Sequence, residues 1–175
     1  MPALHAGVPG DRVALGRTDI MVSRLAWGMW RFQGDDLHYA RSLVDAAFAA
    51  GINLFDTADI YGYDGRAGFG NAEVLLGRLF AADPGLRRQM VLASKGGIIP
   101  GVPYDSSASY LVAACEASLR RLGIDCLDLF QVHRPDLLMR ASCRASATSE
   151  ISCSRPAAMA SLSTPTLRMP SRSSQ

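Results

Sequence analysis

Four ionisable side chains follow three successive apolar segments of the chain, each with the length and composition of a buried strand. These side chains belong to Asp56, Tyr61, Lys95 and His133. In a barrel of parallel strands the C-terminal ends of the strands lie on one face, so residues far apart in the sequence meet there. We therefore expect the four side chains to converge on a single site.

Together the four residue types suit the transfer of a proton to a carbonyl oxygen. A tyrosine hydroxyl, with a pKa of about 10, is a poor acid at neutral pH unless a cation stabilises the phenolate. Lys95 can supply that cation, Asp56 can orient the ammonium group, and His133 can hydrogen-bond the carbonyl of a substrate. Tyr61 would then protonate the carbonyl oxygen while the carbon accepts a hydride.

Lys95 is the one lysine of the chain, beside seventeen arginines. An ammonium group is a compact point charge, whereas a guanidinium group is planar and always protonated, so the two are not interchangeable. The alternative is a chance lysine on a surface loop. Taken singly, Asp56, Tyr61 and His133 could also be cap or turn residues. Four such types at three consecutive strand ends favour a shared site.

Length and composition predict one soluble globular domain, because the 175 residues are 49% apolar with a net charge of +2. The small charge and the absence of a basic run argue against nucleic-acid binding. No apolar stretch is long enough to cross a membrane, and the N-terminus lacks a signal-peptide pattern, so we expect a cytoplasmic protein. The four cysteines lack CxxC or zinc-ligand spacing, and no metal is predicted.

The composition changes abruptly at about residue 140. All sixteen glycines and every aromatic residue precede this point, and the last 36 residues hold ten serines, five arginines and one acid, Glu150. We therefore divide the chain into an N-terminal extension (1–10), a body (11–139) and a low-complexity Ser/Arg-rich tail (140–175). The tail is too poor in large apolar groups to offset its ordering entropy.

Two interpretations of the tail remain open. One is a natural flexible extension. The other is a coding sequence that has slipped into another reading frame. We favour the frame slip, because the break falls just after a motif where more protein is expected.

Strands and helices are predicted to alternate in the body, after a small hairpin formed by residues 13–15 and 20–22. The expected strands are 25–28, 52–56, 90–95 and 126–133, and the expected helices are 37–50, 71–80 and one from Ser106 or Ser107 to Gly123. In the second helix we expect Val74, Leu75 and Leu79 to be buried. Such alternation predicts an α/β fold with a parallel sheet covered by helices.

No G-x-G-x-x-G motif follows a strand into a helix, which disfavours a doubly wound dinucleotide-binding sheet. We therefore predict a (β/α)8 TIM-barrel type of fold, truncated to about the first four β/α units.

Three sequence strings carry a resemblance to a known family. They are Asp-Thr-Ala-Asp-Ile-Tyr-Gly at 56–62, Ser-Lys at 94–95, and Asp-Leu-Phe-Gln-Val-His-Arg-Pro-Asp at 128–136. With these strings the chain resembles the aldo-keto reductases, and its His-Arg-Pro-Asp ending is similar to that of a bacterial branch. The resemblance covers about residues 11–139, roughly half of a typical barrel of this fold.

The resemblance implies an eight-stranded barrel that reduces aldehydes or ketones to alcohols with NADPH as the hydride donor. It implies a catalytic set with Tyr61 as the general acid, and the set consists of Asp56, Tyr61, Lys95 and His133. The partner it implies is a small carbonyl substrate rather than a nucleic acid or a membrane.

The same resemblance places further residues around the cofactor and the substrate. Gly28, Met29 and Trp30 would lie with Asp56 near the nicotinamide. Trp30 and Tyr63 would line the substrate pocket, although aromatic residues there are equally suited to packing. Strands five to eight, which carry most of the cofactor site in the family, have no counterpart in residues 11–139.

Alternatives from other functional classes remain. The chain could be a non-catalytic partner or accessory module on this scaffold, or a functionless truncated product. The intact set of four catalytic residue types argues against a pure binding role, since binding alone does not need Lys95 and Tyr61 together.

We predict little or no reductase activity for the 175-residue chain. A half barrel leaves its first and fourth strands with unpaired edges, through which two copies could associate. Oxidation of NADPH by the purified chain with a generic aldehyde tests this prediction. Robust turnover would show that the missing strands are dispensable.

Overall fold

The computed structural model describes residues 11–102 and 104–134, so the predicted extension (1–10) and tail (140–175) lie outside the described residues. A small antiparallel sheet comes first, formed by β1 (Arg12–Ala14) and β2 (Met21–Ser23). A four-stranded parallel sheet follows in the order β3-β4-β5-β6. Its strands are β3 (Ala26–Gly28), β4 (Leu54–Asp56), β5 (Val91–Gly96) and β6 (Leu129–Val132).

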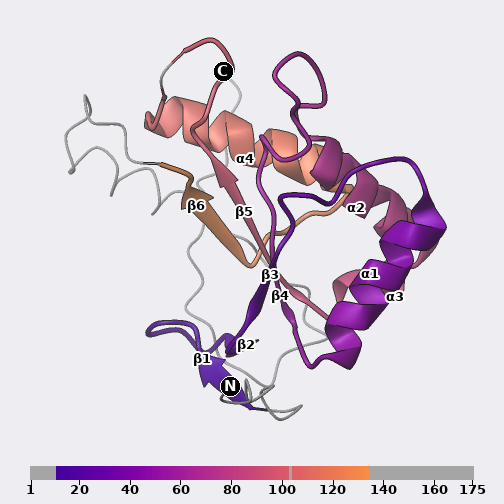
Figure 1. The fold of residues 1–175 in the computed structure, drawn as a ribbon. Helices are drawn as coiled ribbons and strands as arrows, with labels where there is room; N and C mark the ends of the chain where they lie inside the picture. Colours follow the sequence, from indigo (N-terminus) through magenta and orange to yellow (C-terminus); the bar gives the residue numbers. More distant parts are fainter. Residues whose placement is uncertain (1–10, 103, 135–175) are drawn as a thin grey trace, which may run out of the picture.

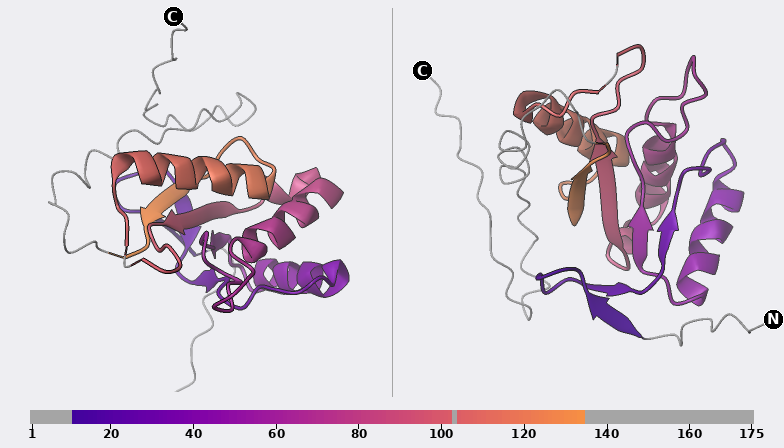
Figure 2. Two further views of the ribbon diagram at one scale, coloured as in Figure 1. Left: turned by 90° about the horizontal axis from the view of Figure 1, so that it is seen from above. Right: turned by 60° about the vertical axis from the view of Figure 1, so that its left-hand side comes forward.

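Helices connect the parallel strands and lie along one face of the curved sheet (Figures 1 and 2). They are α1 (Leu37–Ala49), α2 (Asn71–Ala82), α3 (Pro84–Arg87) and α4 (Ala108–Leu122). Each strand pairs with the next one along the chain, as in the first units of a barrel. The predicted α/β fold is confirmed, with a hairpin followed by four parallel strands that alternate with helices; any helix after β6 would lie outside the described residues, and the short helix α3 was not predicted.

The helix ends follow from local capping residues. Asp36 precedes α1 and accepts a hydrogen bond from the Tyr39 N–H at 2.9 Å. Ser107, one of the two predicted caps, precedes α4 and accepts from the Tyr110 N–H at 3.3 Å. Gly123 ends α4 in the left-handed conformation, as predicted. Side-chain oxygens at these positions satisfy donors that the helix itself leaves unpaired.

Asn53 attaches the hairpin to the parallel sheet. Its Oδ1 accepts a hydrogen bond from the Ser23 N–H at 2.7 Å, and its Nδ2 donates to the Met21 carbonyl oxygen at 3.0 Å. Because Asn53 comes just before β4, the hairpin lies at the end of the sheet where the parallel strands begin (Figure 1). The opposite end of the sheet, where the predicted site residues stand, is left open.

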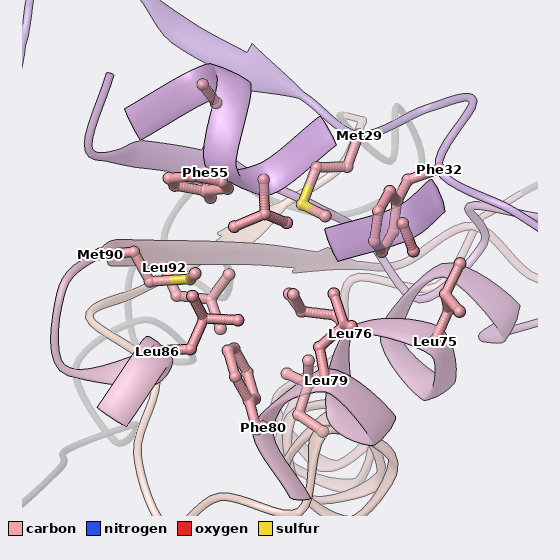
Figure 3. Packing of buried hydrophobic residues seen from close by; sticks show 14 of the residues in the cluster. Met29, Phe32, Phe55, Leu75, Leu76, Leu79, Phe80, Leu86, Met90 and Leu92 are labelled. Atoms are coloured by element: carbon pink, nitrogen blue, oxygen red, sulfur yellow. The ribbon is translucent and has the colours of Figure 1, made fainter. Parts of the chain in front are cut away.

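The main hydrophobic core fills the layer between the sheet and the helices. Figure 3 shows Phe55 of β4 and Leu92 of β5 facing side chains of α2 that include Leu76 and Phe80. Phe55, Leu76 and Leu92 are fully enclosed. Burial of one such side chain contributes about 1.5–3 kcal/mol. This packing holds the strands at fixed positions and therefore fixes their C-terminal ends.

One predicted core position on α2 is wrong. Val74 is 41% exposed, whereas the neighbouring Glu73 is completely buried. Glu73 lies between the Ser94 hydroxyl and the Arg121 guanidinium, which satisfy both of its oxygens. Adjacent helix positions differ by about 100° in direction, so the buried carboxylate places Val74 on the solvent side. Leu75 and Leu79 are buried as predicted.

The loop between Tyr61 and α2 closes on itself. Gly62 and Gly68 lie against each other with φ angles of +90° and +86°, and a Cβ atom on Gly68 would overlap the Gly62 carbonyl oxygen. Within the loop, Asp64 Oδ1 accepts hydrogen bonds from the N–H groups of Arg66 and Ala67, both at 2.8 Å. The loop is therefore a compact unit with glycine at its base.

Among the described residues, no helix has the length and apolar character needed to cross a bilayer.

Replacement of Gly77 by alanine tests how closely α2 and α4 approach. The added Cβ would fall onto the Arg121 carbonyl oxygen and within 3.0 Å of the Leu122 backbone. Alanine favours a helix by about 1 kcal/mol over glycine. We expect the backbone overlap to outweigh that gain and to lower the free energy of unfolding by about 1–3 kcal/mol. Urea unfolding measures the change.

Val74→Ala is the matched control on the same helix, and as an exposed substitution it should stay within about 0.5 kcal/mol of the parent chain. A Gly77→Ala chain more stable than its parent would contradict the close approach of the two helices.

Candidate active site

The pairing between β4 and β5 continues past the end of β4. The Thr57 N–H donates to the Ala93 carbonyl oxygen at 2.9 Å, and the Asp59 N–H donates to the Lys95 carbonyl oxygen at 3.0 Å. Residues 57–59 therefore run alongside β5. This extension brings Asp56, at the end of β4, beside Lys95 on the neighbouring strand.

Lys95 is bound on three sides. Its Nζ lies 2.7 Å from Asp56 Oδ2, 2.9 Å from the Thr57 carbonyl oxygen and 3.0 Å from the Tyr61 hydroxyl. An ammonium group has three donors, and these three acceptors match them. The Lys95 side chain is only 14% exposed, so its charge is poorly screened by water. A cation in this position stabilises negative charge that develops on the tyrosine oxygen.

Tyr61 is anchored by its backbone and flanked by two rings. Its N–H donates to the Ala58 carbonyl oxygen and its carbonyl accepts from the Ala72 N–H, both at 3.1 Å. The Trp30 ring centroid lies 5.4 Å from that of Tyr61, and the His133 ring stands edge-on at 5.6 Å. The tyrosine ring thus stands between the loop after β3 and the end of β6.

His133 follows β6 and stays attached to β5, because its N–H donates to the Gly96 carbonyl oxygen at 2.8 Å. Its Nδ1 is buried without a hydrogen-bond partner among the described residues. Burial, together with the positive charges of Lys95 and Arg134, lowers the pKa of His133 to about 4. The imidazole is therefore neutral at pH 7 and can act as a hydrogen-bond donor or acceptor without carrying charge.

A cavity of about 650 Å³ lies in front of Tyr61 and His133. Trp30 and Tyr63, the two predicted pocket residues, both line it. Several further lining residues were not predicted, and the polar ones include Arg31, Gln33 and Tyr104. Arg31 and Gln33 follow the end of β3, and their position just beyond a strand end was a usable signal. Nothing in the sequence marked Tyr104.

Besides Asp56, three residues were predicted near a nicotinamide, and they differ in placement. Gly28 ends β3 beside Asp56, and a Cβ atom added to it would meet nothing within 4 Å. Trp30 is 63% exposed at the cavity wall. The Met29 side chain is instead enclosed in the hydrophobic core, and its N–H is used by the Asp56 carbonyl oxygen at 2.9 Å. Met29 can therefore contribute only its backbone, and not its side chain, to the site.

A nicotinamide ring is compatible with these residues at its reacting end. The open space over Gly28, beside Asp56, leaves room for the ring, and Tyr61 lines the cavity. Gly28 and Tyr61 are thus the residues that would lie against the ring and the reacting carbonyl. Across residues 11–102 and 104–134, no cluster of three or more His, Cys, Asp or Glu side chains is placed to hold a metal ion.

Comparison with protein families matches residues 24–151 to the aldo/keto reductase family. The chain is 58% identical over 126 residues to a 6-dehydroglucose reductase of Novosphingobium aromaticivorans, which covers 71% of this chain and 41% of that protein. It is 37% identical over 144 residues to a 6-dehydroglucose reductase of Agrobacterium fabrum, covering 75% of this chain and 46% of that protein.

Among solved structures, the holo form of the aldo-keto reductase AKR11C1 from Bacillus halodurans matches with a TM-score of 0.63 and 31% sequence identity. The match covers 78% of this chain and 44% of that one. The chain therefore spans less than half the length of these relatives.

The charge state of His133 can be tested by NMR titration of its imidazole. In the unfolded chain a histidine titrates near 6.5, whereas in the folded protein the pKa of His133 is about 4. As the pH falls from 6.5 to 4, the unfolded state binds the proton first, so this residue makes the fold less stable over that range. We expect a titration midpoint near pH 4, with His133→Asn assigning the signal.

Arg134→Gln removes one of the positive charges beside His133 and should move that midpoint upward. A midpoint at or above 6.5 in the parent chain would contradict the buried, neutral imidazole.

Proposed function

The chain belongs to the aldo/keto reductase family, and we propose that it carries out the reduction of an aldehyde or ketone to an alcohol with NADPH as the hydride donor. The observation that supports this most is the set of contacts of Lys95, whose Nζ meets Asp56, the Thr57 carbonyl and the Tyr61 hydroxyl at 2.7–3.0 Å. The arrangement provides a proton donor beside a fixed positive charge.

In this proposal each of the four residues has one role. Tyr61 gives its hydroxyl proton to the carbonyl oxygen, and the Lys95 ammonium stabilises the negative charge left on the tyrosine. Asp56 holds Lys95 in position. His133, neutral at the working pH, hydrogen-bonds the same carbonyl oxygen and orients it. Bound NADPH supplies the hydride that the carbonyl carbon accepts.

For the substrate, we propose a small hydroxylated carbonyl compound of the kind named for the Novosphingobium relative. The support from this chain is a set of polar side chains in a mixed cavity lining, among them Arg31, Gln33 and Tyr104. The hydroxyl groups of such a substrate can form hydrogen bonds with these side chains. An apolar aldehyde could form none with them.

Three features of the proposal rest on the sequence. They are NADPH as the cofactor, which the family resemblance implies, a cytoplasmic location, and the division of the chain into 1–10, 11–139 and 140–175. The accessory-module alternative would need a binding partner and no turnover. The contacts between Lys95 and Tyr61 favour catalysis over that alternative, because a binding surface gains nothing from a buried ammonium against a tyrosine hydroxyl.

We also propose that the chain associates with itself through β3 and β6. They are the outer strands of the four-stranded sheet, and within the described residues neither has a second strand partner. Unpaired backbone groups on such edges are templates for strands of another copy.

A hybrid protein tests the catalytic role of Tyr61. Residues 1–134 are joined to the remaining part of the Novosphingobium reductase, and oxidation of NADPH with an aldehyde is followed by absorbance. We expect turnover by the hybrid, and a loss of about 10²–10⁴-fold in kcat for Tyr61→Phe, since the general acid is removed. Tyr39→Phe, which removes the same hydroxyl group from an exposed tyrosine of α1 outside the cavity, is the matched control and should stay within a few-fold of the parent.

A Tyr61→Phe hybrid with an undiminished rate would exclude Tyr61 as the acid. A folded hybrid with no turnover would favour the accessory-module alternative. Light scattering on the 175-residue chain and on the hybrid tests self-association. We expect only the 175-residue chain to associate, because the added strands of the hybrid cover the edges of β3 and β6.

A further inference from the structure

Asp59 is a buried carboxyl group that the proposed mechanism does not use. The residue is 1% exposed, and neither of its carboxyl oxygens has a hydrogen-bond partner among the described residues. Its backbone, in contrast, is fixed, since its N–H donates to the Lys95 carbonyl oxygen at 3.0 Å. A buried acid in this state is costly as a charged group and needs a physical explanation.

The Asp59 carboxyl lies behind the active site, on the helix side of the sheet. A Cβ atom on Gly96 would stand 3.4 Å from Asp59 Oδ2 and 3.1 Å from the Ala114 Cβ of α4. Successive residues of a strand face opposite sides, so Gly96 faces the helices while Lys95 faces the cavity. Asp59 and the Lys95 ammonium are therefore separated by the sheet and joined through one backbone hydrogen bond.

Two buried carboxyl groups lie near one arginine, and only one of them is paired with it. Glu73 of α2 accepts hydrogen bonds from Arg121 Nε at 2.7 Å and from the Ser94 hydroxyl at 2.6 Å. Arg121 of α4 also donates to the Ser118 hydroxyl at 3.2 Å. The guanidinium is thus committed to Glu73, and Asp59 is left without an ion-pair partner beside a second negative charge.

We propose that residues 57–61 keep their place beside Lys95 only while the Asp59 carboxyl group is protonated, which makes Asp59 a positioning residue. This inference deepens the proposed function and rests on it for its catalytic meaning. Residues 57–61 carry the Thr57 carbonyl, which binds Lys95, and Tyr61 itself. An ionised Asp59 carboxylate would be drawn toward Arg121 or toward water, and either movement displaces that segment from Lys95.

The charged and titratable groups around Asp59 determine the pH at which its carboxyl group ionises. Burial, followed by the negative charge of Glu73, raises the pKa of Asp59 from 3.8 to about 7. Arg121 of α4, the backbone N–H of Ile60 and Lys95 of β5 oppose that rise. The pKa of Tyr110 of α4 is raised by burial first and then by the negative charge of Asp59, so this tyrosine also belongs to the surroundings of Asp59.

The raised pKa has a defined effect on stability. Between about pH 4 and 7 the folded protein keeps a proton that the unfolded chain releases, so this group makes the fold less stable as the pH rises through that range. Above pH 7 both states are ionised and no further change is expected. Near neutral pH, the placement of the Lys95–Tyr61 pair therefore depends on pH through a residue that touches neither substrate nor cofactor.

The single lysine of the chain gives a direct readout that needs no turnover. In protein grown with ¹³C-lysine, the side-chain NMR signal of Lys95 is followed from pH 5 to 9. We expect a step in its chemical shift with a midpoint near pH 7. In Asp59→Asn, which keeps the shape of the side chain and removes its titration, the step should disappear while the contacts of Lys95 persist.

Two further variants make the result specific. Glu73→Gln removes the negative charge beside Asp59 and frees Arg121, so the midpoint of the step should move to lower pH. His38→Gln changes an exposed histidine of α1 and should leave the step unchanged. A Lys95 signal without a step, or a step that persists in Asp59→Asn, would overturn the inference. A purified chain without reductase activity would not, because the NMR signal is independent of catalysis.

Discussion

Continuation of strand pairing beyond the end of β4 is the constraint on which the site depends. Two backbone hydrogen bonds, from Thr57 to Ala93 and from Asp59 to Lys95, hold residues 57–59 against β5. Without them the chain would leave the sheet at Asp56, and the tyrosine loop would have no fixed relation to Lys95. The chemistry of the site thus depends on backbone geometry as much as on the side chains that perform it.

A buried ion pair supports this arrangement from the helix layer. Glu73 and Arg121 join α2 to α4, and Ser94 ties the pair to β5. Such pairs often add little net stability, since removing both charges from water is costly, but breaking one partner is strongly destabilising. We interpret the pair as setting how α2 is rotated against the sheet, which the exposure of Val74 reflects.

Much of the fold and the site could be predicted from the sequence because they follow short-range rules. Strand ends in a parallel sheet share one edge, so the convergence of Lys95 with Asp56 and Tyr61 needed no knowledge of packing. Glycine and serine at the ends of α4 are strong local signals. The burial of Asp59 could not be predicted in this way. It depends on α4 docking over Gly96, a contact between segments distant in the chain.

Helix α2 illustrates the same limit. An apolar pattern predicts that a helix is amphipathic, but Val74 and Glu73 are adjacent and either could face inward. The choice depends on Arg121, which is 48 residues away along the chain. The position of Tyr104 in the cavity lining could not be predicted for a similar reason, because this residue comes from a loop whose path no local pattern defines.

The closed loop after Tyr61 has a consequence for how this site can diverge. Gly62 and Gly68 meet at its base, and Asp64 holds the interior of the loop together without help from the rest of the protein. Because Gly62 and Gly68 fix where the chain enters and leaves the loop, residues 63–67 can be exchanged without moving Tyr61 or α2, provided that the new segment replaces the internal hydrogen bonds of Asp64. Tyr63 lies within that exchangeable segment and lines the cavity. New substrate preferences can thus arise by loop replacement while the proton donor stays in place.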